Sequence, residues 1–347
     1  IIYTSGTTGQ PKGALITFGM HWWNAVGSAL NMRLRDDDCW LACLPFYHIG
    51  GLSILLRSAI YSMRIVVLPP PFDASAINAA IVAERVSIIS VVTVMLQRML
   101  TALDACAATY PPLLRCVLLG GGPAPLPLLQ DCARRNIPVT QTYGLTESCS
   151  QATTLAPGEA LQRLGSAGRP LAAVRLRIAR AGGGEAAAHE TGEIQLAGPT
   201  ITPGYDGRPE ATARAFHDGW FATGDLGYRD AAGYLYVLDR RVDLIVSGGE
   251  NVYPAEIEAA LLSHPAVAEV GVCGVADAQW GQAPVAFARL HAGATATEDD
   301  LLVFARERLA RYKVPKAVYF VSELPCTASG KLLRRELPGL LPPASPE

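Results

Sequence analysis

The chain has 347 residues, half of them hydrophobic, which is enough for more than one domain and for a large core. Its 29 lysines and arginines nearly balance 31 aspartates and glutamates, and the net charge of −2 excludes the strongly basic surface typical of nucleic-acid-binding proteins. The eight cysteines show neither Cys-x-x-Cys spacing nor a cluster with histidine, which predicts reduced thiols of a cytoplasmic protein and no zinc site.

The first thirteen residues predict a strand end followed by a loop that binds polyphosphate. Apolar residues 1–3 precede glycines that allow positive φ and close backbone approach, so that several N–H groups can point at one anion. The loop is not a Walker A motif, because Pro11 and Gly13 stand where that motif needs Gly and Ser or Thr. A generic surface loop is the alternative. The predicted phosphate-binding residues are Thr4, Ser5, Gly6, Thr7, Thr8, Gly9 and Lys12.

Short apolar runs then alternate with helical patterns, a rhythm typical of a parallel sheet with helices on both faces. Arg57 and Arg64 interrupt the apolar stretch 50–71, so we expect no membrane span there. We also expect no signal peptide. The predicted strands are 65–68, 87–92, 115–119 and 137–141, and the predicted helices are 74–84, 95–103 and 126–135.

After residue 165 the pattern changes twice. Short strands at 174–180, 193–196, 227–228 and 234–238 predict a smaller antiparallel β subdomain. Helices at 254–262 and 298–309, with strands at 267–275, 285–290 and 318–321, then predict a compact α+β domain.

Residues 141–148 follow a predicted strand end, where open α/β sheets bind ligands. Glu147 can hold Mg²⁺, Thr146 can donate to a phosphate, and Tyr143 offers a flat ring to adenine. The alternative is a helix-capping segment.

Together these segments resemble the adenylate-forming enzymes, a family that includes acyl- and aryl-CoA synthetases, luciferases and peptide-synthetase adenylation domains. The loop at 4–13 matches the family's ATP-binding signature, and residues 141–148 match its Tyr-Gly-x-Thr-Glu motif. Thr-Gly-Asp at 223–225 and Pro-x(4)-Gly-Lys at 325–331 follow in the family's order, so the resemblance covers residues 1–337. It implies that ATP activates a carboxylate to an acyl-adenylate with release of pyrophosphate, and that a thiol, usually coenzyme A, then displaces AMP.

The resemblance also implies residue roles. Asp225 and Arg240 would contact the ribose, and Lys331 would stabilise charge in the adenylation transition state. Gly248 and Gly249 would let the pantetheine of coenzyme A approach the backbone. Each role has an alternative. Asp225 could belong to a β-turn, Arg240 could form a surface ion pair, and Lys331 could be a solvated lysine.

The fold implied is α/β. We expect a large adenylating domain over residues 1–238, with parallel sheets and a small β-barrel-like subdomain. A hinge at 239–243 would join it to a mobile C-terminal α+β domain over 244–347. Val242 stands where the family commonly has a polar hinge residue. Family members carry a segment before the ATP-binding loop, so we expect the N-terminal part of the large domain to be missing.

The acid would bind between the ATP-binding loop and residue 148. His48 could stack on an aromatic acid or orient its carboxylate, although a buried core histidine is the alternative. Arg57 interrupts an apolar helical run and could pair with a second carboxylate of the substrate. Gly120, Gly121 and Gly122 offer a floor for a flat acid.

The segments LPFYHIGGLSILLR and LLGGGPAPLPLL resemble the o-succinylbenzoate-activating branch of the family, which serves menaquinone biosynthesis. That branch implies o-succinylbenzoate, ATP, Mg²⁺ and coenzyme A as the small-molecule partners. The alternatives are a ligase for benzoic or fatty acids, a domain that loads a carrier protein, and a non-catalytic nucleotide-binding fragment.

Overall fold

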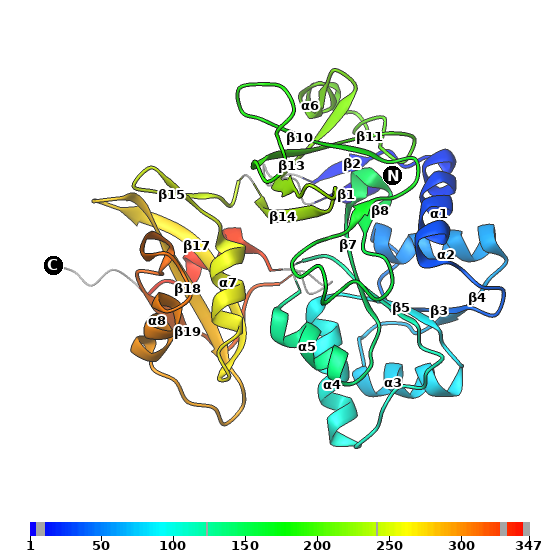
Figure 1. Ribbon diagram of the computed structural model, residues 1–347, viewed down its shortest axis with the longest axis horizontal. Coiled ribbons are helices and arrows are strands. Elements are labelled where there is room, and N and C mark those ends of the chain that lie inside the picture. Colours follow the sequence, from blue (N-terminus) through cyan, green and yellow to red (C-terminus); the bar gives the residue numbers. More distant parts are fainter. Residues whose placement is uncertain (5–10, 123, 241, 327–331, 343–347) are drawn as a thin grey trace. The chain divides into compact units, whose positions relative to one another are not determined.

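The computed structural model describes residues 1–4, 11–122, 124–240, 242–326 and 332–342 (Figure 1). The chain divides into two compact units. The first comprises Ile1–Ala124 and Leu128–Val237, and the second comprises Pro125–Pro127 and Leu238–Glu347. The predicted hinge begins inside a strand, because Asp239 and Arg240 end β14 (Leu235–Arg240).

The first unit is built on a seven-stranded sheet with the order β4-β3-β5-β6-β7-β8-β9. The pairs from β4 to β7 are parallel, and β8 and β9 are added antiparallel. The expected parallel α/β sheet is therefore confirmed. Its strands are β3 (Cys39–Ala42), β4 (Arg64–Val67), β5 (Ile88–Val91), β6 (Cys116–Leu119), β7 (Val139–Leu145), β8 (Ser150–Thr154) and β9 (Arg169–Pro170).

Helices cover both faces of this sheet because successive residues of its strands point to opposite sides. Leu41, Ile89 and Val117 pack with α3, α4 and α5, whereas the neighbouring Trp40 and Ile88 pack with α1 and α2 on the other side (Figure 1). The helices are α1 (Phe18–Met32), α2 (Ile49–Tyr61), α3 (Ala74–Ala83), α4 (Thr93–Ala105) and α5 (Leu126–Arg134).

The predicted antiparallel subdomain is a five-stranded sheet with the order β10-β11-β13-β12, to which β14 is added beside β13. The predicted strand 227–228 was too short, because β13 runs over ten residues and includes Thr223-Gly224-Asp225. The elements are β10 (Arg175–Ala179), β11 (Gly192–Ala197), β12 (Phe216–His217), β13 (Trp220–Arg229) and the helix α6 (Pro209–Ala215). A separate pair, β1 (Ile2–Thr4) and β2 (Lys12–Ala14), flanks the predicted phosphate-binding loop.

The second unit is α+β, as expected. Its sheet has the order β16-β15-β18-β17, with β19 parallel to β18. The predicted helix 254–262 matches α7 from its first residue to its last, whereas the predicted helix 298–309 ends three residues earlier. The elements are β15 (Ile245–Ser247), β16 (Glu250–Val252), α7 (Pro254–Leu262), β17 (Val267–Asp277), β18 (Gly281–Leu290), α8 (Glu298–Arg306), β19 (Val318–Phe320) and the 3₁₀ helices η2 (Arg311–Lys313) and η3 (Arg334–Leu340).

In the part of the chain that the structure describes, no helix combines the length and apolar character that crossing a membrane requires.

Candidate active site

Two predicted nucleotide-binding residues, 82 positions apart, meet in the first unit. The hydroxyl of Tyr143, on β7, donates to Oδ2 of Asp225, on β13, at 2.6 Å. Both side chains are partly exposed. A phenol ring and a carboxylate thus lie together, one suited to stacking on a base and the other to accepting from ribose hydroxyls.

The Thr-Gly-Asp segment forms an irregularity inside β13. The register against β11 shifts between Glu193 and Gln195, and Gly224 adopts φ of 75°. Thr223 Oγ1 donates to the carbonyl of Ile194 at 2.7 Å and accepts from the N–H of Asp225 at 3.1 Å. A bulge of this kind re-aims a side chain, which explains how an aspartate in the middle of a strand reaches Tyr143.

Gly144, in β7 at a register shift against β8, is required by the close approach of the two strands, since a Cβ atom there would lie 1.6 Å from the carbonyl oxygen of Ser150. Thr146 then begins a 3₁₀ helix, η1 (Thr146–Ser148), as the capping alternative expected. This helix places Glu147, which is 8 % exposed.

Glu147 is held by Tyr205, a residue that the sequence analysis missed. The hydroxyl of Tyr205 donates to Oε1 of Glu147 at 2.8 Å, and the ring centre of Tyr205 lies 5.4 Å from Nζ of Lys12. Burial, followed by the nearby Glu147 charge, raises the pKa of Tyr205, so the phenol stays a proton donor. The only sequence signal was the turn dipeptide Pro203-Gly204 before it, which does not indicate a partner 58 residues away.

Lys12 pairs with Thr4 in the β1–β2 ladder, and Thr4 Oγ1 lies 3.5 Å from the carbonyl oxygen of Lys12. An isolated bridge between Ala14 and Tyr205 anchors the end of this ladder. The predicted phosphate-binding residues 5–9 fall outside the described residues. What is described is the base of that loop, brought together with Glu147 through Tyr205.

A Mg²⁺ ion in proteins commonly takes one or two carboxylates and completes its shell with water and substrate phosphates. Among the described residues no cluster of three or more His, Cys, Asp or Glu side chains could hold a metal by itself. Glu147 could supply one such carboxylate, and its Oε1 accepts a hydrogen bond from the Tyr205 hydroxyl at 2.8 Å.

Gly120, Gly121 and Gly122 follow β6 at the carboxyl edge of the parallel sheet, where ligands bind in such folds. A Cβ atom on Gly120 would lie 2.9 Å from Cγ2 of Thr142, the residue before Tyr143. Gly121 has φ of 80°, and a Cβ on Gly122 would meet nothing within 4 Å. The structure therefore brings this glycine segment to the same edge as the Tyr143 motif.

His48 is the residue before the first turn of α2, and its ring lies 4.6 Å from that of Tyr47. Burial lowers the pKa of His48, which keeps its imidazole neutral at pH 7. A partly exposed neutral imidazole at the start of a helix can stack on a ring or donate one hydrogen bond.

Arg57 neither reaches solvent nor meets an acid among the described residues. It is 2 % exposed, its Nη2 donates to Oδ1 of Asn24, and its guanidinium lies 5.3 Å from the ring centre of Trp40. Its Nε is buried without a hydrogen-bond partner in the described part of the chain. Burial lowers the pKa of Arg57, so an anion beside it would be strongly favoured.

In the second unit, Gly248 and Gly249 form the turn between β15 and β16, with φ of 59° and 88°. The N–H of Gly248 donates to the carbonyl of Trp280 at 2.8 Å, and the indole ring of Trp280, which is half-exposed, lies against Gly248. Lys331 lies outside the described residues, and of Arg240 only the backbone is described, at the end of β14.

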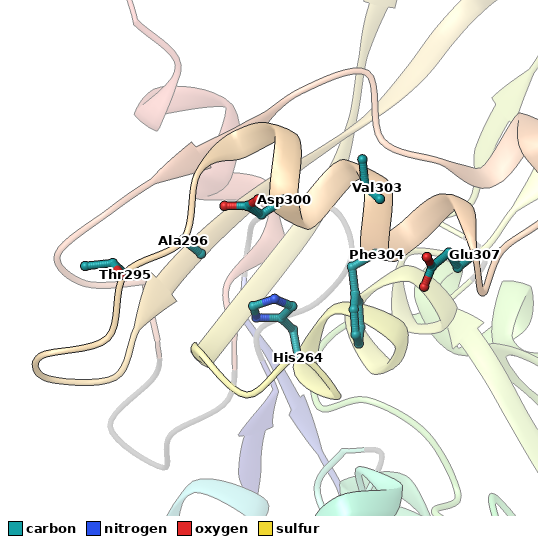
Figure 2. Close-up of a pocket in the computed structure, with 7 residues that line it drawn as sticks. All are labelled: His264, Thr295, Ala296, Asp300, Val303, Phe304 and Glu307. Atoms are coloured by element: carbon teal, nitrogen blue, oxygen red, sulfur yellow. The ribbon is translucent and has the colours of Figure 1, made fainter.

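The second unit also has a pocket of about 450 Å³ between α8 and the end of α7, lined by His264, Asp300, Phe304 and their neighbours (Figure 2). None of the predicted site residues lines it.

Comparison with known proteins agrees with the fold and the order of motifs. Residues 1–206 match the family of AMP-binding enzymes, and residues 256–331 match the AMP-binding enzyme C-terminal domain. A 2-succinylbenzoate–CoA ligase of Geobacillus kaustophilus is 59 % identical over 342 residues, which cover 99 % of this chain and 69 % of that protein.

Solved structures also resemble the chain. An o-succinylbenzoate–CoA synthetase of Bacillus subtilis, in complex with its acyl-adenylate intermediate, is 48 % identical with a TM-score of 0.89, covering 97 % of this chain and 68 % of that one. The ATP-bound MatB of Rhodopseudomonas palustris is 31 % identical with a TM-score of 0.87, covering 98 % of this chain and 67 % of that one.

Proposed function

The chain belongs to the AMP-binding enzyme family. From that premise we propose that it is a ligase that converts o-succinylbenzoate, ATP and coenzyme A to o-succinylbenzoyl-CoA, AMP and pyrophosphate. The observation that carries this proposal is the 59 % identity to a 2-succinylbenzoate–CoA ligase over 99 % of the chain. We further propose that the enzyme works in the cytoplasm.

The reaction has two steps. A carboxylate oxygen of the acid attacks the α-phosphorus of ATP, and pyrophosphate leaves with the electrons of the broken P–O bond. The sulfur of coenzyme A, having lost its proton, then attacks the acyl carbon, and AMP leaves. Lys331, by its place in the motif, would stabilise the charge that develops in the first step.

The nucleotide end of the site would be formed by Tyr143 and Asp225. The hydrogen bond of 2.6 Å between them fixes the ring and the carboxylate as one surface. Asp225 would accept from the ribose hydroxyls while the Tyr143 ring stacks on adenine. Arg240 and Thr146 would add contacts to the ribose and the phosphates.

The phosphate end would be formed by the loop that starts at Thr4 and ends at Lys12, together with Glu147. When bound, Mg²⁺ would neutralise charge on the phosphates and hold them in line for attack. Glu147 would hold it, because the Tyr205 hydroxyl fixes one carboxylate oxygen and thereby orients the other.

The acid end would be formed by α2 and the glycine segment at 120–122. His48 would contact the aromatic ring, and the glycines would form the floor beneath it. Arg57 supports a dicarboxylate substrate, because it is a buried cation whose described hydrogen bond goes to the neutral Asn24 and whose Nε has no hydrogen-bond partner among the described residues. A second carboxylate of the substrate would supply the missing charge, either directly or through polar groups beside Arg57.

Coenzyme A would approach the second unit at Gly248 and Gly249. Both glycines have positive φ, so a larger residue would strain this turn, and at Gly248 a Cβ would also meet the Trp280 ring at 2.7 Å. The indole ring beside the turn, half-exposed, offers an apolar surface to pantetheine.

The test is product formation by the full-length protein. With o-succinylbenzoate, ATP, Mg²⁺ and coenzyme A, mass spectrometry should detect o-succinylbenzoyl-CoA and AMP in equal amounts, with none when any one component is omitted. Formation of AMP and a CoA thioester only with benzoate or malonate would retain the ligase chemistry and contradict the substrate.

A further inference from the structure

Helix α1 carries a stripe of polar side chains on one of its faces. The stripe consists of residues spaced by three, four and three positions, which lie on the same side of a helix: His21, Asn24, Ser28 and Asn31. The first three are 8, 2 and 0 % exposed. Burial of polar side chains is costly unless they form hydrogen bonds, so this face of α1 needs polar partners.

Asn24 is the residue of the stripe that binds the backbone just after Glu147. Its Nδ2 donates to the carbonyl of Gln151 at 2.8 Å and to that of Ser148 at 3.4 Å, and its Oδ1 accepts from Nη2 of Arg57. A guanidinium can only donate, so the bond from Arg57 fixes which end of the amide is the oxygen. The amide nitrogen is therefore directed at the two carbonyls.

The turn that Asn24 binds is strained. Cys149 and Ser150 are consecutive residues with positive φ, 56° and 93°, a region that residues with side chains rarely adopt. Such a conformation persists only where the surrounding structure holds it. Asn24 spans the strained pair, because its two carbonyl partners lie on either side of it, at positions 148 and 151.

The neighbours of Asn24 in the stripe contact side chains of the same segment. Nδ1 of His21 lies 3.3 Å from Sγ of Cys149, and the hydroxyl of Ser28 donates to Oε1 of Gln151 at 2.8 Å. These contacts hold the segment against α1 without binding its backbone. Among the described contacts of the stripe, those of Asn24 are therefore the ones that hold the turn on both sides of the strained pair.

Glu147 belongs to this turn. The N–H of Cys149 donates to the carbonyl of Thr146 at 3.0 Å, so the strained residue closes the 3₁₀ turn in which Glu147 lies. On its other side, the carbonyl of Glu147 accepts from the N–H of Thr202 at 2.7 Å, and Tyr205 holds its carboxylate. The backbone of Glu147 is thus fixed between the segment 202–205 and helix α1, and a shift of the strained pair would move the carboxylate.

We propose that Asn24 is a positioning residue for metal binding: by holding the strained turn at 149–150, it keeps the carboxylate of Glu147 in the position from which it would hold Mg²⁺. The inference rests on the proposed function, since it takes Glu147 as the residue that binds the metal. Asn24 acts through the backbone of the turn, and the bond from Arg57 orients its amide for that role.

The test compares Asn24→Ala with Asn31→Ala in the full-length protein. Both remove an amide of the stripe that donates to a backbone carbonyl, but Asn31 binds Thr154, beyond the turn, at 3.4 Å. Asn24→Ala should raise the Mg²⁺ concentration for half-maximal ATP–pyrophosphate exchange by about fivefold, as for loss of a neutral hydrogen bond. Saturating Mg²⁺ should restore the rate to within about twofold of wild type. Asn31→Ala should leave the Mg²⁺ titration unchanged.

A second variant, Asn24→Asp, covers the case in which Asn24→Ala does not fold. Aspartate keeps an acceptor for Arg57 and can neutralise its buried charge, but it lacks the donors to the carbonyls at 148 and 151. It should shift the Mg²⁺ titration in the same direction as Asn24→Ala.

Hydrogen exchange of the protein without metal or nucleotide tests the turn itself. Amides of residues 146–151 should exchange faster in both Asn24 variants than in wild type or Asn31→Ala. An unchanged Mg²⁺ titration, a loss that saturating Mg²⁺ does not restore, or unchanged exchange in this segment would overturn the role of Asn24. Wild-type protein without any pyrophosphate exchange would instead contradict the proposed function, while hydrogen exchange would still decide whether Asn24 holds the turn.

Discussion

The hydroxyl of Tyr143 donates a hydrogen bond of 2.6 Å to Oδ2 of Asp225, and this bond joins two sequence motifs on different sheets. It holds together the ring that we propose to stack on adenine and the carboxylate that we propose to bind the ribose. Preorganisation of this kind reduces the entropic cost of ordering these side chains when a ligand binds.

Asp225→Asn should weaken ATP binding more than Tyr143→Phe. The asparagine loses the negative charge that accepts from both ribose hydroxyls, a loss of about 1.5–3 kcal/mol, or roughly tenfold to a hundredfold in the KM for ATP. The phenylalanine keeps the ring and loses only the hydroxyl, so its KM should rise by about threefold. Steady-state kinetics with varied ATP measures both. A larger effect in Tyr143→Phe would mean that the hydrogen bond, and not the ribose contact, determines affinity.

Glu147→Gln should raise the Mg²⁺ concentration needed for half-maximal activity by about tenfold, because the amide is a neutral and weaker ligand. Tyr205→Phe is the matched control: it removes the hydroxyl that holds Oε1 but leaves the carboxylate in place. It should shift the Mg²⁺ titration by no more than about threefold. Identical titrations for Glu147→Gln and wild type would rule out this carboxylate as the metal ligand.

Arg57→Leu should discriminate between substrates. Activity with o-succinylbenzoate should fall by about a hundredfold in kcat/KM, while activity with benzoate, measured in the same preparations, should change by less than about threefold. Asn24→Ala is the control, because it removes the amide that binds the guanidinium and keeps the cation. It therefore distinguishes an effect of altered packing around Arg57 from an effect of the lost charge. If Arg57→Leu lowers kcat/KM equally with both acids, the role of the arginine is only to stabilise the packing around Trp40.

The pair of Asp38 and Arg115 should make stability depend on acid pH. Although burial alone would raise the pKa of Asp38, hydrogen bonds from Arg115, Ser87 and the backbone of Arg35 lower it below its ordinary value. The ionised carboxylate therefore stabilises the fold above the unfolded-state pKa of about 4. This contribution is lost as pH falls through the lowered folded-state pKa.

Asp38→Asn should accordingly cost about 3 kcal/mol in the free energy of unfolding at pH 7, because the side chain is 1 % exposed and its loss leaves Arg115 unpaired. The difference from wild type should shrink as the pH of urea unfolding is lowered below 4. Glu84→Gln, in a pair whose side chains are both half-exposed, is the control and should change little at any pH. A constant difference between Asp38→Asn and wild type down to pH 2 would contradict the assignment.

Local patterns predicted the parts of the fold that depend on neighbours in sequence. The helix over Pro254–Leu262 was predicted to the residue because Pro254 suits a first turn. Helix α1 was not predicted, because Phe18, Trp22 and Leu30 place large apolar groups on its exposed side and obscure the 3.6-residue period.

In the candidate site too, the sequence indicated residues with a local pattern and missed contacts between residues far apart in the chain. Glu147 and Tyr143 were proposed from residue chemistry, and Asp225 from the family resemblance; the hydrogen bond between Tyr143 and Asp225 shows that two of these residues meet. Tyr205 could not be found, because its role comes from a partner 58 residues earlier in the chain. For Arg57 the sequence predicted pairing with a second carboxylate of the substrate, which stays a prediction. The partner that the structure shows is the neutral side chain of Asn24, 33 positions away on α1, and the sequence did not indicate it. Tertiary contacts of this kind have no local signature.

The most direct measurement of the central claim is ATP–pyrophosphate exchange by the full-length protein with o-succinylbenzoate and a panel of benzoates, malonate and fatty acids. Exchange isolates the adenylation step from coenzyme A. The account predicts that o-succinylbenzoate drives exchange at least about a hundredfold faster than any monocarboxylate, as expected when a second carboxylate meets a buried cation. Exchange that is fastest with a monocarboxylate, or absent with every acid, would contradict it.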